Sequence, residues 1–170
     1  QAEWGVTIQK AQALRRQNKD EQAWQLLLSE PPATLKIMPD GWWEERRAAA
    51  YAALKAGKPK IAYRLVADPG PMEVNASKDA EFLAGWIALR KLDDAKRADK
   101  HFHALQKDAD GPLSRARALY WLGRSREALG DAAKAREYYT AASAYIDTFH
   151  GQLARLKLDP DHEDPPTADA

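Results

Sequence analysis

The side chains that most often carry out chemistry in proteins occur here in spacings that do not assemble a catalytic site. Two pairs of acids, Glu44-Glu45 and Asp93-Asp94, are adjacent in the sequence. Neighbouring residues on a helix point about 100° apart, so neither pair can share a proton as a carboxylate dyad does. We interpret these acids as solvated or helix-capping residues. The chain has no cysteine, which excludes a thiol nucleophile, a disulfide framework and a cysteine-based zinc site.

The histidines are the remaining candidates for a metal site. His101 and His103 lie two positions apart, so on a helix they project to nearly opposite sides, whereas zinc-binding helices place two histidines four positions apart. The other two are His150 and His162. No glycine-rich phosphate loop, dinucleotide fingerprint or Gly-x-Ser-x-Gly motif occurs. We therefore expect no catalytic residue, no metal and no other cofactor in this chain.

Aromatic and basic side chains are the better candidates for binding a ligand. Trp42 and Trp43 open a predicted helix, and Arg46 follows them. Two adjacent tryptophans cannot both face the same core, so one of them is expected to be partly exposed or to lie where two repeats meet. Exposed aromatic rings stack on sugars as well as on nucleobases, which makes the pair a candidate ligand platform. The tryptophans interpreted as core residues are Trp24, Trp86 and Trp121.

A second group of candidate binding residues surrounds Tyr120. It consists of Arg115, Arg117 and Arg124. Arg117 and Arg124 are seven positions apart and therefore share one side of a helix. A row of guanidinium groups beside an aromatic ring suits carboxylates or phosphates. The alternative interpretation is a solvated helix face.

The elements that must position these residues are helices. Alanine, leucine, arginine, lysine and glutamate dominate, strand signals are nearly absent, and apolar residues recur at helical spacing. Short breaks at Gly57-Lys58-Pro59, Leu92-Asp93-Asp94 and Leu129-Gly130-Asp131 force the flanking helices to lie antiparallel. The fold class is therefore all-α. We expect a short helix over 148–158 after four helical hairpins, at about 5–29, 40–67, 78–107 and 113–146.

These hairpins form an internal repeat. When the four hairpins are aligned on a small residue of their second helix, the matching positions are separated by 39, 36 and 37 residues. Helix–turn–helix units with a period in the mid-thirties are typical of tetratricopeptide-like repeats. The prediction is a right-handed superhelical stack of TPR-like hairpins, in which each hairpin buries its apolar face against its neighbours. The aligned residues are Ala23, Ala62, Ala98 and Ala135.

The net charge of +1 hides an uneven distribution. Residues 159–170 carry five acids and no Lys or Arg, and this Pro-rich tail is predicted to be disordered. The superhelical domain, residues 1–158, then has 26 basic and 20 acidic residues, a formal charge of +6. Such a field attracts anionic partners, but the charge is too dispersed to indicate nucleic acid. No stretch has the ~20 apolar residues that a transmembrane helix needs.

Three segments together resemble the superhelical domain of bacterial soluble lytic transglycosylases, the periplasmic enzymes that cleave peptidoglycan in the cell wall. The resemblance covers about residues 40–158. Its first segment continues to Ala62-Tyr63-Arg64-Leu65, and its second begins at Ala80-Glu81. Its third segment runs from Ser114 to Arg124 and ends in Gly151-Gln152-Leu153-Ala154. The most specific motifs are this ending, Trp42-Trp43-Glu44-Glu45-Arg46-Arg47 in the first segment and Gly85-Trp86-Ile87-Ala88-Leu89-Arg90 in the second.

The resemblance implies a role but no activity. Members of that family carry a separate catalytic domain with a Glu-Ser pair, and this sequence has no such pair. Family members usually have a proline near the position of Asp147 and an aromatic residue at the position of His150, so this chain departs from the family at these two places. We therefore expect a non-catalytic domain, exported to the periplasm by a signal removed or outside this chain, which binds or guides glycan strands or muropeptides for a catalytic domain elsewhere. The alternative is a TPR-like scaffold that binds a protein or peptide partner.

Overall fold

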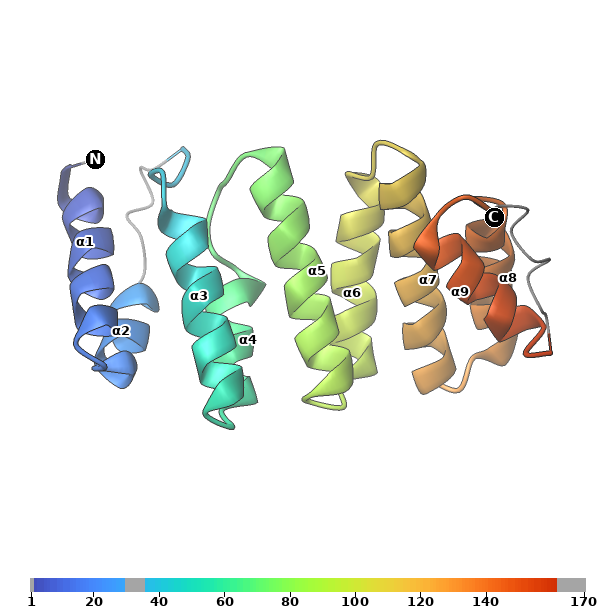
Figure 1. Cartoon of the computed structure of the whole chain (residues 1–170), viewed down its shortest axis with the longest axis horizontal. Coiled ribbons are helices and arrows are strands. Elements are labelled where there is room, and N and C mark those ends of the chain that lie inside the picture. The colour runs from blue at the N-terminus through green and yellow to red at the C-terminus, as the bar shows by residue number, and fades with distance from the viewer. Residues whose placement is uncertain (1, 30–35, 162–170) are drawn as a thin grey trace, which may run out of the picture. The chain divides into compact units, whose positions relative to one another are not determined.

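The computed structural model describes residues 2–29 and 36–161, and all regular structure in these ranges is helical (Figure 1). This confirms the predicted all-α class. Among the described helices, none combines the length and the apolar content needed to cross a membrane. The helices are α1 (Ala2–Arg16), α2 (Asp20–Leu27), α3 (Trp42–Lys55), α4 (Pro59–Ala67), α5 (Val74–Arg90), α6 (Ala95–Lys107), α7 (Pro112–Ala128), α8 (Ala132–Ser143) and α9 (Phe149–Leu158).

The predicted hairpins correspond to α1–α2, α3–α4, α5–α6 and α7–α8. Helix α5 begins four residues earlier than the predicted 78 because Glu73 caps it, with its Oε1 accepting a hydrogen bond from Ala76 N at 3.1 Å. The last helix begins where the sequence indicates. Thr148 Oγ1 accepts from Gly151 N at 3.0 Å and supplies the N-cap of α9.

The turns between paired helices share one geometry. Each contains a residue with positive φ, which ends the first helix in the left-handed region. In three turns the next backbone N–H donates to the carbonyl five residues back, at 2.8–2.9 Å, whereas the α5–α6 turn is one residue longer. The positive-φ residues are Asn18 (57°), Gly57 (72°), Asp93 (52°) and Gly130 (79°).

The four aligned alanines occupy equivalent positions. Each is buried, lies five residues after the left-handed turn residue, and donates its N–H to the carbonyl four residues back, at 3.0–3.1 Å. The residue four positions further on is also buried in every pair. The helix–turn–helix repeat is therefore confirmed at the level of local geometry, and the superhelical stacking stays a prediction. These following residues are Leu27, Val66, Phe102 and Tyr139.

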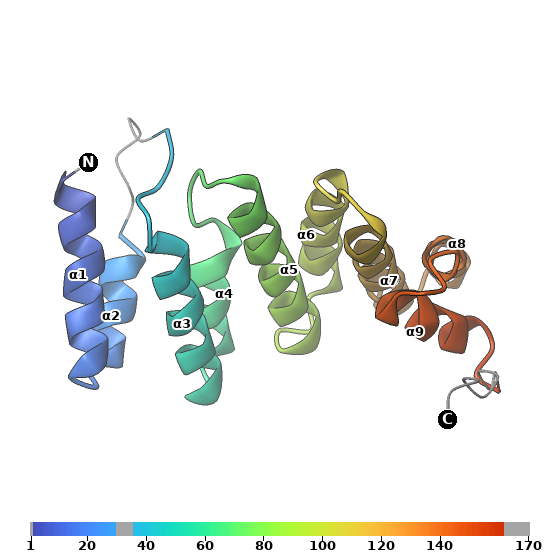
Figure 2. The same ribbon diagram turned by 45° about the horizontal axis from the view of Figure 1, so that its top comes forward.

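The chain divides into two compact units, Gln1–His101 and Phe102–Ala170. In the first, α1 lies beside α2 and α3 lies beside α4 (Figure 2). Its core includes Trp42 and Leu65. In the second, α7, α8 and α9 pack around Tyr139. That residues 1–158 form a single domain stays a prediction, and most of the tail predicted to be disordered, with His162, lies outside the described residues.

Candidate functional site

The two adjacent tryptophans are both buried, on different sides of the start of α3. Trp42 is 1% exposed and Trp43 is 5% exposed. The Nε1 of Trp42 donates to the carbonyl oxygen of Pro69 at 2.7 Å, and that of Trp43 donates to Asp79 Oδ2 on α5 at 2.9 Å. Trp43 therefore lies where α3 meets α5, one of the two expected positions, and neither ring exposes a face on which a sugar can stack.

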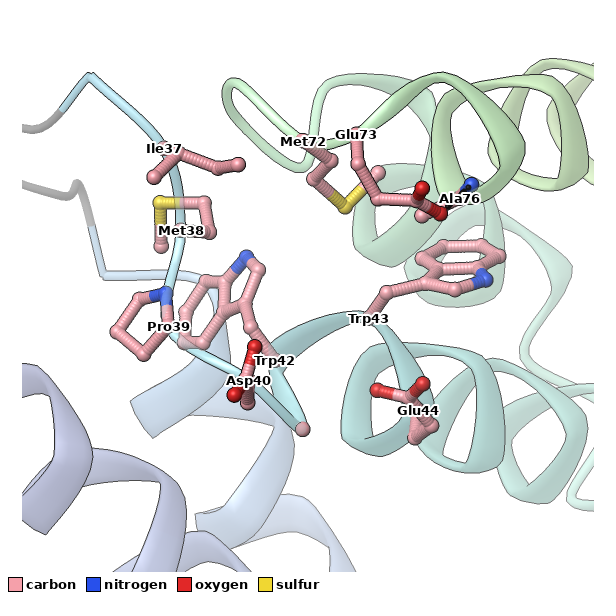
Figure 3. Close-up of a pocket in the computed structure, with 11 residues that line it drawn as sticks. Ile37, Met38, Pro39, Asp40, Trp42, Trp43, Glu44, Met72, Glu73 and Ala76 are labelled. Carbon is pink, nitrogen blue, oxygen red and sulfur yellow. Dashed lines mark hydrogen bonds between the residues drawn. The ribbon is translucent and has the colours of Figure 1, made fainter.

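Parts of both rings line a pocket of about 270 Å³ (Figure 3). Trp42 lies beside Met38 on one side of it, and Trp43 lies near Ala76 on the other. The rim carries the exposed acids Asp40, Glu44 and Glu73, so the pocket does not suit an anionic ligand. The pocket residues are Ile37, Met38, Pro39, Asp40, Gly41, Trp42, Trp43, Glu44, Met72, Glu73 and Ala76.

Arg46 is buried in the core and bonded to backbone carbonyl groups. It is 4% exposed, and its guanidinium lies 5.2 Å from the centroid of the Trp42 ring. Its nitrogens donate to the carbonyl oxygens of Leu65 and Leu27 at 2.5 Å and of Arg64 at 3.2 Å, near the C-termini of α4 and α2. Burial lowers the pKa of Arg46 to about 10, although Asp68 opposes the shift. Carbonyls at helix ends need donors, and Arg46 supplies them from within the core.

Of the predicted arginine cluster on α7, Arg124 contacts Tyr120 directly. Tyr120 is buried and accepts a hydrogen bond from Arg124 Nη1 at 3.0 Å, and the Arg124 guanidinium lies 5.2 Å from the Trp121 ring centroid. Arg117 is half-buried, whereas Arg115 is exposed and is not part of these contacts between described residues. Arg124 therefore lies against the aromatic rings of Tyr120 and Trp121, and the row of guanidinium groups stays a prediction.

A basic hollow on α4, absent from the sequence-based predictions, is the strongest candidate site. Its volume is about 670 Å³, and it lies in the first unit between α4 and the start of α6. A neighbouring hollow of about 500 Å³ shares Tyr63 and Arg64 with it and extends towards the end of α2. We call the larger one the α4 hollow. More cationic than acidic side chains line it. The lining residues are Lys60, Tyr63, Arg64, Leu92, Asp94 and Arg97.

The helical spacing on α4 explains why cations gather there. Lys60 and Arg64 are four residues apart with Tyr63 between them, so all three share one face. Arg97 approaches from α6, with its guanidinium 5.4 Å from the Tyr63 ring centroid and its Nε 3.4 Å from Asp94 Oδ2. Three cationic side chains and one carboxylate around a hollow give a local positive field, which suits an anionic ligand.

A chain of short hydrogen bonds leads away from this hollow. The Tyr63 hydroxyl lies 2.7 Å from His101 Nε2, and His101 Nδ1 lies 2.6 Å from Glu81 Oε2 on α5. The His101 side chain is 14% exposed and that of Glu81 is 32% exposed. Burial raises the pKa of the Tyr63 hydroxyl, although the nearby Arg97 opposes the shift. Tyr63 thus keeps its proton at neutral pH and remains a hydrogen-bond donor.

Sequence reasoning missed this site because its members are far apart along the chain. Tyr63 and His101 are 38 residues apart, and Glu81 is 20 residues from His101. The available signal was the i, i+3, i+4 arrangement of Lys60, Tyr63 and Arg64, and the position of Tyr63 and Glu81 inside two of the segments that carry the family resemblance.

The predicted divergence of the two neighbouring histidines is confirmed. His101 contacts Tyr63 and Glu81, whereas His103 Nε2 lies 3.2 Å from the Tyr138 hydroxyl. Within residues 2–29 and 36–161, no group of three or more His, Cys, Asp or Glu side chains is placed to hold a metal ion. Comparisons of the chain with known protein families, with curated proteins and with solved structures found no match.

Proposed function

We propose that this chain is the non-catalytic, superhelical domain of a periplasmic lytic transglycosylase and that it binds peptidoglycan strands. The repeated turn geometry supports a stack of TPR-like hairpins, since each pair presents equivalent buried alanines at the same place. The three-segment resemblance supports the family. Binding would hold glycan strands or muropeptides near a catalytic domain that lies outside this sequence.

The observation that carries the binding proposal is the cationic lining of the α4 hollow. The peptide stems of peptidoglycan carry free carboxylates, and the arginine fork matches a carboxylate well. Arg64 and Lys60 are both exposed, so they reach a ligand without any rearrangement of the core. Tyr63 adds a partly exposed aromatic ring beside them, which suits a sugar or an aliphatic side chain.

Co-sedimentation with isolated sacculi tests the proposal. The chain is expected to sediment with sacculi at low salt and to be released as the salt concentration rises, because the interacting charges are exposed to solvent. Incubation with sacculi is expected to release no anhydro-muropeptides, since the chain is proposed to be non-catalytic. If the chain stays in the supernatant at low salt, the proposal is wrong.

A matched pair of charge reversals locates the site. Arg64→Glu is expected to weaken binding about tenfold at low salt, since it changes two unit charges that are each worth ~0.7 kcal/mol at ~6 Å in water. Lys55→Glu, which makes the same change in net charge at an exposed position in the last turn of α3, is expected to have a much smaller effect. Equal losses in the two variants would show that the α4 hollow is not the site.

Binding of a protein partner is the second candidate function, and the second unit favours it. Large apolar side chains there are exposed, with Leu113 at 71%, Phe149 at 67% and Ile146 at 54%. Exposed apolar side chains of this size are candidate contacts for a partner. Chemical crosslinking in periplasmic extract would test this function. A partner captured by the wild type and lost in Phe149→Ser, with sacculus binding unchanged, would support it.

A further inference from the structure

We propose that Tyr63, His101 and Glu81 make the α4 hollow a proton-linked carboxylate site, in which the Tyr63 hydroxyl donates to a ligand carboxylate when His101 carries a proton on both ring nitrogens. The inference rests on the proposed function, because the peptide stems of peptidoglycan supply the carboxylate. It adds a specificity-determining residue, Tyr63, and a condition under which the ligand is held.

The geometry defines two hydrogen-bonding states. Glu81 Oε2 lies 2.6 Å from His101 Nδ1, and an ionised carboxylate only accepts, so Nδ1 keeps its hydrogen in both states. When the imidazole is neutral, Nε2 is an acceptor, and the Tyr63 hydroxyl 2.7 Å away donates its proton to it. The tyrosine then has no proton to offer a carboxylate.

Protonation of His101 reverses the direction of the second hydrogen bond. The new N–H on Nε2 donates to the Tyr63 oxygen, and the tyrosine keeps its own proton, which turns away from the histidine. Tyr63 lines the α4 hollow, and in the proposed state a carboxylate bound there accepts this proton. No covalent bond changes, and the only proton gained by the complex is the one on Nε2.

The charged groups around the hydrogen bonds of Tyr63, His101 and Glu81 come from three helices. Glu81 on α5 accepts from His101 Nδ1, whereas the cations of the α4 hollow carry charge of the same sign as an imidazolium. A bound carboxylate offsets those cations and favours protonation of His101. Ligand and proton therefore promote each other's binding, as linkage requires. The charged groups that face Tyr63 and His101 are Lys60 and Arg64 on α4, Glu81 on α5, and Asp94 and Arg97 at the start of α6.

The sign of the pH effect follows from this coupling. At lower pH a larger fraction of the protein carries the second His101 proton and offers the Tyr63 hydroxyl to the ligand, so affinity rises. A hydrogen bond to a charged acceptor at a partly exposed site is expected to make binding about five- to tenfold tighter at pH 5.5 than at pH 8. Stem carboxylates with ordinary pKa values stay ionised across this range.

Isothermal titration calorimetry of the full chain with a purified disaccharide-tetrapeptide muropeptide tests the inference. Measurements at pH 5.5 and pH 8, in buffers of different ionisation enthalpy, give the affinity and the number of protons taken up. We expect tighter binding and proton uptake at the lower pH. The same muropeptide with its carboxyl groups amidated is expected to bind without pH dependence.

Four variants separate this role from a structural one. Tyr63→Phe keeps the ring and is expected to lose most of the gain in affinity at pH 5.5. His101→Gln is expected to remove both the pH dependence and the proton uptake. Glu81→Gln removes the charged acceptor of His101 Nδ1 and is expected to reduce the gain in affinity at pH 5.5. The matched control is His103→Gln, whose side chain contacts Tyr138 and not the α4 hollow, and it should behave as the wild type.

Each outcome points to one conclusion. Binding that is equally tight at the two pH values overturns the proton-linked site and leaves the proposed function in place. The same holds if His101→Gln and Tyr63→Phe, each folded by circular dichroism, keep the wild-type pH dependence. Absence of binding at both pH values, in the calorimeter and with sacculi, overturns the proposed function and this inference together.

Discussion

The ring of Tyr139 on α8 occupies the space that a side chain at Gly123 on α7 would need. A Cβ on Gly123 would meet the Cε1, Cδ1 and Cζ atoms of that ring closer than real Cβ atoms approach any neighbour. Small residues stand at the corresponding position in the α1–α2 and α3–α4 pairs. Ala11 and Ala50 lie seven residues before their left-handed turn residue, as Gly123 does, and both are fully buried. In the α7–α8 pair, close approach of the two helices thus combines a small residue on one helix with a larger one on the next.

Gly123→Ala is expected to destabilise the second unit by ~1–3 kcal/mol, because the added methyl group overpacks the contact with Tyr139. The free energy of unfolding by urea, followed by circular dichroism, measures the change. Gly111→Ala is the control, since its φ of −175° is extended and a Cβ there meets nothing within 4 Å.

Replacing Tyr139 by a smaller residue in the Gly123→Ala variant gives a second check on that contact. Val66 stands at the equivalent position in the α3–α4 pair, nine residues after its left-handed turn residue. The double variant Gly123→Ala/Tyr139→Val is therefore expected to lose less stability than the sum of the two single variants. Strict additivity would contradict a direct clash.

Arg46→Met is expected to lower the free energy of unfolding by ~2 kcal/mol, because the carbonyl oxygens of Leu27 and Leu65 lose a buried charged donor. Arg46→Lys is expected to recover little, since one ammonium group does not have the guanidinium geometry that spans these carbonyls. The adjacent Arg47→Met is the control. Its ion pair with Asp79 is about 40% exposed on both sides, so a loss below ~1 kcal/mol is expected.

Alanine substitution of the turn glycines is expected to be destabilising although space is available. Gly57 and Gly130 have φ of 72° and 79°, and a Cβ at either position meets nothing within 4 Å. The cost of Gly57→Ala or Gly130→Ala is therefore conformational and should be ~1 kcal/mol. Thermal unfolding of the two variants checks this value, and no change in either would contradict the left-handed turn.

The α5–α6 turn allows the converse experiment. Asp93 has φ of 52° without being glycine. Asp93→Gly is expected to be more stable than Asp93→Ala by ~1 kcal/mol, because only glycine adopts this conformation without a Cβ penalty. Comparing two variants at the same position cancels the contribution of the lost carboxylate. If the alanine variant is the more stable, the turn assignment is wrong.

His150 is expected to make the second unit less stable in acid. Burial lowers the pKa of His150 from its usual 6.5, and the positive charge of Arg117 adds to the shift. The unfolded chain therefore binds a proton more readily than the folded chain. The corresponding stability is present above pH 6.5 and is lost as the pH falls through the lower folded-state pKa.

Urea unfolding at pH 7.5 and pH 5 measures this loss. His150→Phe keeps a ring beside Tyr120, whose centroid lies 5.6 Å from that of His150, and removes the proton site. We expect the variant to show a smaller difference between the two pH values than the wild type. Parallel curves for the wild type and His150→Phe would contradict this assignment.

Local patterns in the sequence were sufficient to predict the helices and their pairing. The breaks at Gly57 and Gly130 and the spacing of the alanines give the hairpins because helix formation and turn geometry depend on residues within a few positions of each other. The same patterns identified the four aligned alanines, since a small residue lets two helix axes approach closely. The start of α5 was predicted late because Glu73 is a less familiar cap than Ser, Thr, Asp or Asn.

Only the tertiary structure decided which candidate side chains are available to a ligand. Trp42 and Trp43 read as a possible platform, but Pro69 and Asp79, both more than 25 residues away in sequence, hold their indole nitrogens in buried positions. Arg46 read as a basic ligand-binding residue, and the ends of α2 and α4 enclose it. Tyr63, His101 and Glu81 meet only after α4, α5 and α6 have packed together. The sequence therefore determined the helices, because their hydrogen bonds are local. The site depended on which helix faces meet, and that is settled by packing between segments far apart in the chain.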